Sequence, residues 1–209
     1  AVISLLFVFA ILSFIGIGES AAVAVIISFA HLSTLTLLLG GCIWTIAHEA
    51  PDFTIFWQNV AYQDKIAPNW WNAIYFGFAA ASLGVSGFET SANFISEQRP
   101  GVFVQTLRNM WVLSSFFNFT ICTSCLFLIP VQQIVEQDLS ATLLAIMAEK
   151  SLGRWFVYVL CCDAFLVLSG AVLTSYAGIG GLTVRLTLDR CLPHFLLQTN
   201  SLRGTHHWI

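Results

Sequence analysis

The chain consists of long apolar stretches separated by short polar segments. A helix needs about 20 residues to cross roughly 30 Å of hydrocarbon, and several stretches come close to that length. The pattern therefore predicts five membrane-spanning helices, at about 1–18, 21–46, 71–96, 109–130 and 155–182. A shorter amphipathic helix is expected at about 138–150, with Asp138 or Ser140 as its N-cap. The predicted fold is an all-α integral membrane protein with a single membrane domain over 1–209.

Composition supports a membrane location. Of the 209 residues, 57% are hydrophobic and 9% are charged, whereas soluble domains carry about 25% charged residues. The formal net charge is −3 and no basic tract is present, so no nucleic-acid partner is expected. The glycines at 178–181 lack the preceding strand that a nucleotide-binding loop requires, and no cofactor is expected.

The six cysteines are interpreted as small packing residues rather than as a disulfide set. All but Cys191 lie inside apolar runs. Cys122 and Cys125 have the C-x-x-C spacing, but they fall within a predicted span without a second pair or nearby histidines. The sequence therefore predicts no zinc or redox site and no other metal site.

The predicted span at 71–96 contains the stretch Gly84-Val85-Ser86-Gly87-Phe88-Glu89. Its glycines, serine and glutamate weaken a helix where the bilayer demands unbroken backbone hydrogen bonding. Unwound backbone survives there only when protein buries it or when it lines a watery cavity. Discontinuous helices of this kind are where secondary transporters bind their substrates. The alternative is a continuous helix whose glycines allow close packing against a neighbour.

Two ionisable residues lie within predicted spans. His31 is the side chain in 21–46 that is expected to titrate near neutral pH, and Asp163 shares a stripe of small and polar residues with Gly170 and Thr174. An ionisable residue in a span is by default a functional hypothesis. Each also has a structural alternative: His31 bonds to a serine or carbonyl of a neighbouring helix, and Asp163 bonds to a hydroxyl or backbone group.

Several motifs resemble the amino acid/polyamine/organocation permease superfamily. Gly87-Phe88-Glu89, Ala92-Asn93-Phe94 and Thr106-Leu107-Arg108-Asn109 are similar to its sixth helix and the following loop. The run from Leu168 to Tyr176, followed by Arg185, Asp189 and Leu192-Pro193, is similar to its eighth helix and cytoplasmic exit.

The resemblance covers nearly the whole chain, since Gly16 to Ala21 is similar to the turn between the family's fourth and fifth helices. It implies that the five spans correspond to helices four to eight of a fold with two inverted five-helix repeats and a discontinuous helix. On that basis the chain is expected to be an internal fragment of a longer permease.

The resemblance also implies a function. A permease of this superfamily moves amino acids or related amines across a membrane by alternating access, and a plasma or inner membrane is the implied location. The partners would be a small-molecule substrate, the lipid bilayer, and a proton or sodium ion. The implied substrate site comprises Leu83, Gly84, Val85, Ser86, Gly87 and Phe88, where free amides would hold a carboxylate and free carbonyls an amino group.

One position departs from the family pattern. Many relatives place an aromatic gate over the substrate where this chain has Leu83. We expect either that Phe76 or Phe78 closes the pathway instead, or that the substrate is smaller or held differently.

The coupling residues are implied by position. His31 lies near the place where some proton-coupled relatives carry a lysine, while Thr174 and Ser175 resemble hydroxyls of a sodium site. Glu89 is expected to anchor the broken helix, with a proton-carrying role as the alternative. Proton coupling or exchange is favoured over sodium.

Three other classes of protein compete with the transporter. A membrane-embedded enzyme would need a partner set around His31 at catalytic or ligand spacing, and no such set is evident, so no enzymatic activity is expected. A channel would need a ring of charges or a carbonyl filter, and the sequence shows neither pattern, so a channel is disfavoured. A truncated, transport-incompetent scaffold copy of a permease is the more serious alternative.

Overall fold

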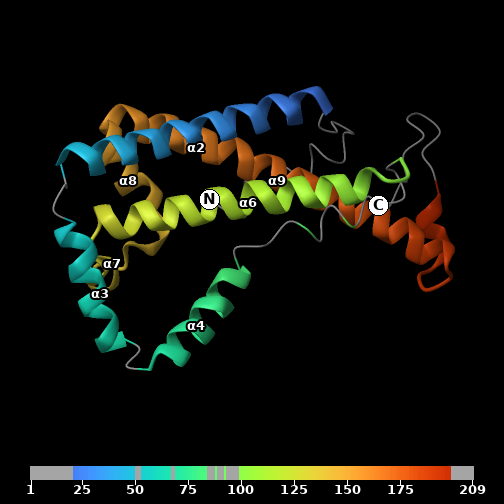
Figure 1. The fold of residues 1–209 in the computed structure, drawn as a ribbon. Helices are drawn as coiled ribbons and strands as arrows, with labels where there is room; N and C mark the ends of the chain where they lie inside the picture. Colours follow the sequence, from blue (N-terminus) through green and yellow to red (C-terminus); the bar gives the residue numbers. More distant parts are fainter. Residues whose placement is uncertain are drawn as a thin grey trace. The chain divides into compact units, whose positions relative to one another are not determined.

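The computed structural model describes residues 21–49, 53–66, 69–83, 88, 92 and 99–198. These residues form helices joined by short turns, and none of them is assigned to a strand, so the all-α prediction is confirmed. Figure 1 shows the order of the elements, which are α2 (Ala21–Glu49), α3 (Thr54–Ile66), α4 (Trp70–Leu83), α6 (Val102–Leu128), α7 (Val131–Glu136), η2 (Leu139–Thr142), α8 (Leu143–Leu152), α9 (Arg154–Leu188) and η3 (His194–Leu197).

Three of these helices are long and apolar enough to cross a membrane. The qualifying segments are Ala24–His48, Val102–Leu128 and Arg154–Val172. They overlap the predicted spans at 21–46, 109–130 and 155–182, although α6 begins at Val102 and α9 continues to Leu188. The predicted span at 1–18 lies outside the described residues. Of the predicted span at 71–96, the structure describes α4 and the single residues Phe88 and Ala92.

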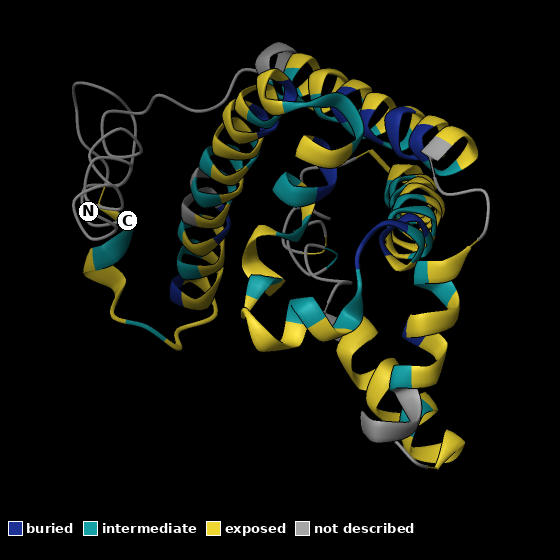
Figure 2. Cartoon of the chain, turned by 90° about the vertical axis from the view of Figure 1, so that its left-hand side faces the viewer, coloured by how far each residue is buried: buried dark blue, intermediate teal, exposed yellow. Residues whose placement is uncertain are grey.

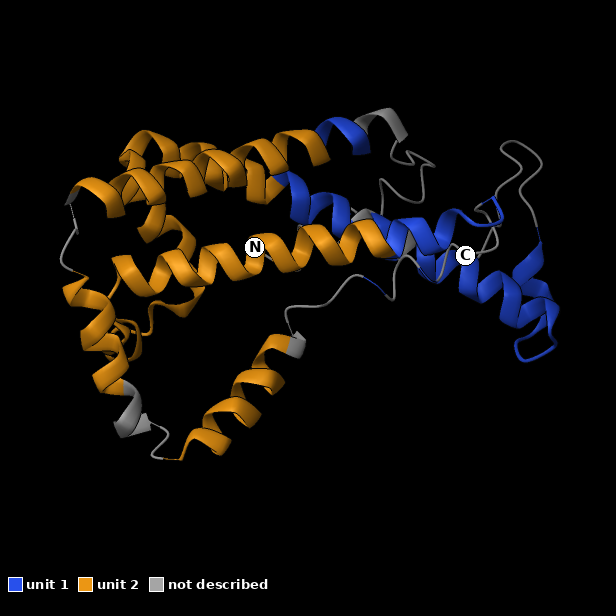
Figure 3. Cartoon of the chain, viewed as in Figure 1, with its two compact units in different colours: residues 1–27, 87–107, 166–209 blue, residues 28–86, 108–165 orange. Residues whose placement is uncertain are grey.

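The chain divides into two compact units (Figure 3). Unit 1 comprises residues 1–27, 87–107 and 166–209, and unit 2 comprises residues 28–86 and 108–165. The helices α2, α6 and α9 each contribute residues to both units.

The hydrophobic core lies in unit 2. Its buried residues are Leu38, Cys42, Cys125, Leu128, Ile129, Met147, Ala148, Phe156 and Leu160. On α2 the buried positions Thr34, Leu38 and Thr45 recur at helical spacing, so a single narrow face of this helix is covered. Figure 2 shows this contrast between buried faces in dark blue and exposed faces in yellow. Large apolar side chains such as Phe29 and Phe119 are exposed, as expected for helices whose outer surface meets hydrocarbon.

A glycine allows α8 to approach α2 closely within this core. A Cβ atom added at Gly41 would lie 2.6 Å from Cγ of Leu152. The next residue, Cys42, places its Sγ 3.8 Å from Oγ of Ser151. Small residues bring membrane helices together in this way, because dispersion contacts grow as the backbones approach.

Polar side chains from two other helices satisfy the end of α6. The last carbonyls of a helix lack intrahelical donors, and Pro130 has no N–H to offer. Asn59 on α3 donates from Nδ2 to the carbonyls of Leu126 at 2.8 Å and Ile129 at 2.9 Å, and its Oδ1 accepts from the N–H of Val131 at 2.7 Å. Lys150 Nζ donates to the carbonyl of Leu128 at 3.1 Å. The corner between α6 and α7 is therefore tied to both α3 and α8.

The expected N-cap of the short helix is wrong. Asp138 adopts a left-handed conformation with φ of 49°, and the 3-10 turn η2 separates it from α8, which begins at Leu143. Ser140 Oγ donates to Asp138 Oδ1 at 3.4 Å, so the two expected caps contact each other. Neither side chain caps a backbone N–H group of α8. The 3-10 turn η2 occupies the residues where the first turn of the helix was expected, so α8 begins further along the chain.

Candidate functional site

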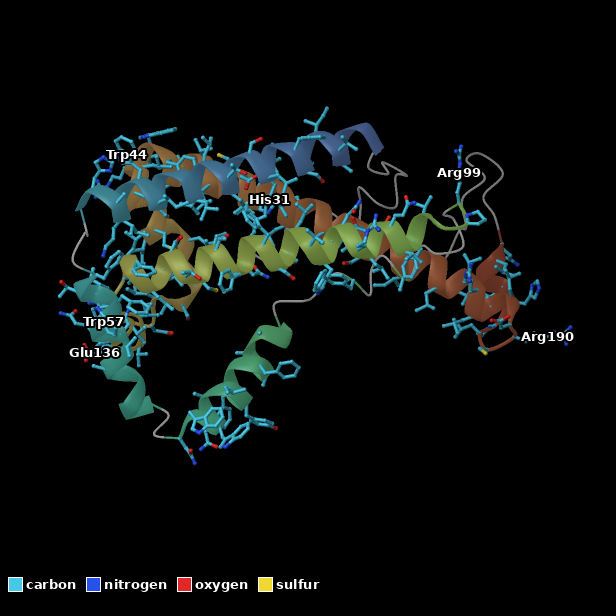
Figure 4. The ribbon with its side chains drawn as sticks, in the orientation of Figure 1. His31, Trp44, Trp57, Arg99, Glu136 and Arg190 are labelled. Atoms are coloured by element: carbon cyan, nitrogen blue, oxygen red, sulfur yellow. The ribbon has the colours of Figure 1, made fainter. Side chains whose placement is uncertain are left out.

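The candidate site is a pair of ionisable side chains inside unit 2. His31 on α2 and Asp163 on α9 lie 132 positions apart in sequence, and Nδ1 of the imidazole is 2.8 Å from Oδ2 of the carboxylate. Figure 4 labels His31 on α2. The side chain of Asp163 is 7% exposed and that of His31 is 36% exposed. The carboxylate therefore forms the buried end of the pair and the imidazole forms the accessible end.

Helical spacing places both residues next to the core. On α9, Asp163 follows Phe156 and Leu160 by seven and three residues, so all three lie on the buried face. On α2, His31 precedes Thr34 and Leu38 by three and seven residues and lies on the covered face of that helix. The pair thus extends the contact between α2 and α9 by one helical turn beyond the apolar residues.

The roles of the imidazole nitrogens follow from the charge of Asp163. An ionised carboxylate only accepts hydrogen bonds, so beside ionised Asp163 the imidazole donates from Nδ1 to Oδ2. The second nitrogen, Nε2, then has its lone pair available. A buried carboxylate is costly unless it is paired and hydrogen-bonded, and His31 supplies both the hydrogen bond and, when protonated, the opposite charge.

This contact differs from both structural alternatives. The alternative for His31 was a bond to a serine or carbonyl of a neighbouring helix. The alternative for Asp163 was a bond to a hydroxyl or backbone group. The structure instead joins the two residues to each other. Sequence reasoning selected both residues but could not pair them, because helical spacing gives the face of a residue and not the opposing helix.

The predicted substrate stretch lies mostly outside the described residues. Leu83 is the last residue of α4, Phe88 is helical and half-buried, and Gly84, Val85, Ser86, Gly87 and Glu89 are not described. The suggested gate residues Phe76 and Phe78 are exposed on α4. The break in this helix, its substrate contacts and the anchoring role of Glu89 therefore stay predictions.

The two hydroxyls of the implied sodium site belong to unit 1. Thr174 Oγ1 donates to the carbonyl of Gly170 and Ser175 Oγ donates to the carbonyl of Ala171, each at 2.8 Å. Thr174 is half-buried and Ser175 is exposed. Their hydrogens are thus used within α9, while each hydroxyl oxygen keeps lone pairs that an ion can coordinate.

Other candidate sites are poorer in polar groups. Among the described residues, no three His, Cys, Asp or Glu side chains lie close enough to hold a metal ion. The six cysteines are free, and Cys42 and Cys125 are buried. A hollow of about 520 Å³ in unit 2 contains no predicted site residue, and its lining residues are Ile43, Ile46, Ala47, Phe53, Thr123, Ser124 and Phe127. The hydroxyls of Thr123 and Ser124 donate to carbonyls of their own helix.

Sequence reasoning missed Asn59 and Lys150. Pro130 signals that α6 must end nearby and that its last carbonyls need donors. That signal does not indicate which distant side chains supply them, because Asn59 and Lys150 come from segments that meet only in the folded chain.

The described residues form an all-α structure with three helices long and apolar enough to cross a membrane. A family model described as "Amino acid permease" matches residues 1–208, so the chain belongs to the amino acid permease family. This match confirms the resemblance to the amino acid/polyamine/organocation superfamily and indicates a transporter rather than an enzyme. No match was found among curated proteins or among solved structures.

Proposed function

We propose that this protein is a secondary active transporter that moves amino acids or related amines across a membrane by alternating access. The observation that carries the proposal is the match of the amino acid permease model to residues 1–208. The three helices suited to cross a membrane support it, since their exposed apolar side chains fit a hydrocarbon surrounding. A multi-pass topology in a plasma or inner membrane is part of the same proposal.

The proposed substrate site is the predicted break at Ser86, Gly87 and Phe88, with Leu83, Gly84 and Val85 beside it. An amino acid carries a carboxylate and an ammonium group, and a broken helix offers free N–H groups to the first and free carbonyls to the second. The partial positive charge at a half-helix N-terminus favours the carboxylate end. The support is the sequence pattern of glycines and serine together with the family match.

Proton coupling or exchange completes the proposal. The pair of His31 and Asp163 supports proton coupling, since an imidazole changes charge near neutral pH and this one lies in a candidate span. If the transporter were instead coupled to sodium, the hydroxyls of Thr174 and Ser175 would be the proposed ligands of the ion.

Exchange of radiolabelled amino acid for unlabelled amino acid in proteoliposomes tests the substrate site. We expect Gly87→Leu to abolish exchange, because a bulky side chain would fill the space that the broken helix leaves for the substrate. Gly77→Leu is the matched control on α4, where an added Cβ meets no atom within 4 Å, and it should exchange normally. Normal exchange by Gly87→Leu would contradict the proposed site. Folded wild-type protein that neither accumulates nor exchanges any amino acid would favour the transport-incompetent scaffold.

A further inference from the structure

We propose that His31 and Asp163 together form the site at which this transporter binds and releases its driving proton. The proposal rests on the transport function above and adds the identity of the coupling site. It starts from the 2.8 Å contact between Nδ1 of His31 and Oδ2 of Asp163. Among the described residues, this is the one ion pair between the two candidate spans that carry these side chains.

The pair has a defined atom for the exchangeable proton. When Asp163 is ionised, Nδ1 donates its hydrogen to Oδ2, so the arriving proton binds Nε2. The 36% exposure of the His31 side chain leaves this end of the imidazole more accessible than the carboxylate, which is 7% exposed. One N–H bond forms when the proton leaves water on one side of the membrane, and the same bond breaks when the proton returns to water on the other side.

Proton binding changes the net charge of the pair. A neutral imidazole beside a carboxylate carries a net charge of −1, whereas an imidazolium beside the same carboxylate carries none. A net charge is costly in a dry protein interior and tolerable when water has access. The protonated pair therefore favours states in which the helices close around it, and the deprotonated pair favours states open to water. Such a difference between two conformations is what coupling requires.

Among the described residues, no second ion pair involves His31 or Asp163. The ion pairs among the described residues are His31 with Asp163 and Arg154 with Glu149. On α8, Lys150 binds the carbonyl of Leu128. The remaining titratable groups on the three long helices within unit 2 are Arg108, Cys122 and Cys125 on α6, Cys42, His48 and Glu49 on α2, and Tyr158, Cys161 and Cys162 on α9. Of these, the side chains of Cys42 and Cys125 are buried, and Cys42 lies about three helical turns from His31 along α2.

The test measures two activities of the full-length protein in the same proteoliposomes. The first is accumulation of radiolabelled amino acid driven by an inward proton gradient, with a trapped pH indicator that reports proton entry. The second is exchange of labelled for unlabelled amino acid without a gradient. We expect His31→Gln and Asp163→Asn to lower driven accumulation by about tenfold or more, which is within the usual range of coupling between two sites. Exchange should fall much less, because it needs no net proton movement.

Matched controls separate coupling from general damage. His48→Gln changes an exposed histidine on the same helix, whose ring stacks on Trp44 and whose Nδ1 lies 3.0 Å from the carbonyl of that residue. Asp138→Asn changes an exposed aspartate outside the candidate spans. Both controls should accumulate like wild type.

The pH profile adds a readout that a purely structural role would not move. The pH profile of driven uptake should differ between Asp163→Asn and wild type, because the variant lacks the carboxylate that accompanies the imidazole when it takes up a proton. Accumulation by His31→Gln equal to that of wild type would overturn the proposal. Wild-type uptake without proton entry would also overturn it, even if the variants fail to fold, and would leave the transport function intact. Absence of exchange in folded wild type would instead contradict the transport function itself.

Discussion

At the level of single residues, an aspartate in a candidate membrane span has an ionisable partner. Asp163 is nearly buried, and it would carry an isolated charge without His31. The partner is a residue that can itself gain or lose charge near neutral pH. A lysine or arginine would neutralise the carboxylate permanently, whereas a histidine makes the neutralisation depend on a proton. This dependence on a proton is what the proposed coupling site requires.

Asn59 illustrates the same scale with a neutral side chain. Asn59→Asp keeps the oxygen that accepts from Val131 but replaces the two N–H donors with an oxygen facing the carbonyls of Leu126 and Ile129. Each buried carbonyl left without a donor costs about 1–3 kcal/mol. We therefore expect a loss of about 2 kcal/mol or more, measured as a lower thermal unfolding midpoint in detergent micelles. Gln58→Glu, the same amide-to-acid change at the exposed neighbouring position, should leave the midpoint nearly unchanged. Equal midpoints for both variants would show that Asn59 does not hold the corner.

At the scale of elements, the contact between α2 and α8 depends on the absence of a side chain. Gly41 is buried against Leu152, whereas at the adjacent Gly40 an added Cβ meets no atom within 4 Å. Both glycines lie inside α2, so replacing either one changes helix propensity in the same way. Only a side chain at Gly41 would also disturb packing against α8.

This difference predicts opposite effects of one substitution. Gly41→Ala should destabilise the protein by about 1–3 kcal/mol, because the partly buried Leu152 side chain that packs against the core must move aside. Gly40→Ala should be neutral or should stabilise α2 by up to about 1 kcal/mol, since alanine favours a helix more than glycine does. Thermal unfolding of the two variants, side by side, measures the contrast. If Gly41→Ala is as stable as Gly40→Ala, the close approach of α8 to α2 is not important for stability.

The elements also show how far sequence reasoning reaches. Apolar stretches of sufficient length predicted helices where α2, α6 and α9 occur, because hydrocarbon thickness constrains length directly. The turn before α8 was predicted wrongly, since the left-handed Asp138 and the following 3-10 turn depend on local geometry that composition does not reveal. His31 and Asp163 could each be selected as ionisable residues in apolar surroundings. Their contact could not be predicted, because it depends on how two helices distant in sequence pack.

At the level of the whole molecule, the family of the chain supports transport and the proposed proton site would supply the driving force. The amino acid permease model matches residues 1–208, so transport is supported across nearly all of the chain. The proposed substrate break and the proposed proton site lie in different segments, and alternating access would link them by making substrate and proton favour the same closed state. The free energy of the proton gradient would then drive the substrate against its own gradient.

The most direct test of this account is amino acid accumulation by the wild-type, full-length protein in proteoliposomes with an imposed inward proton gradient. The account predicts that labelled amino acid accumulates above its external concentration, that protons enter with it, and that a protonophore abolishes the accumulation. Folded protein that gives neither accumulation nor proton entry under these conditions would contradict the central claim that this chain is a proton-coupled amino acid transporter.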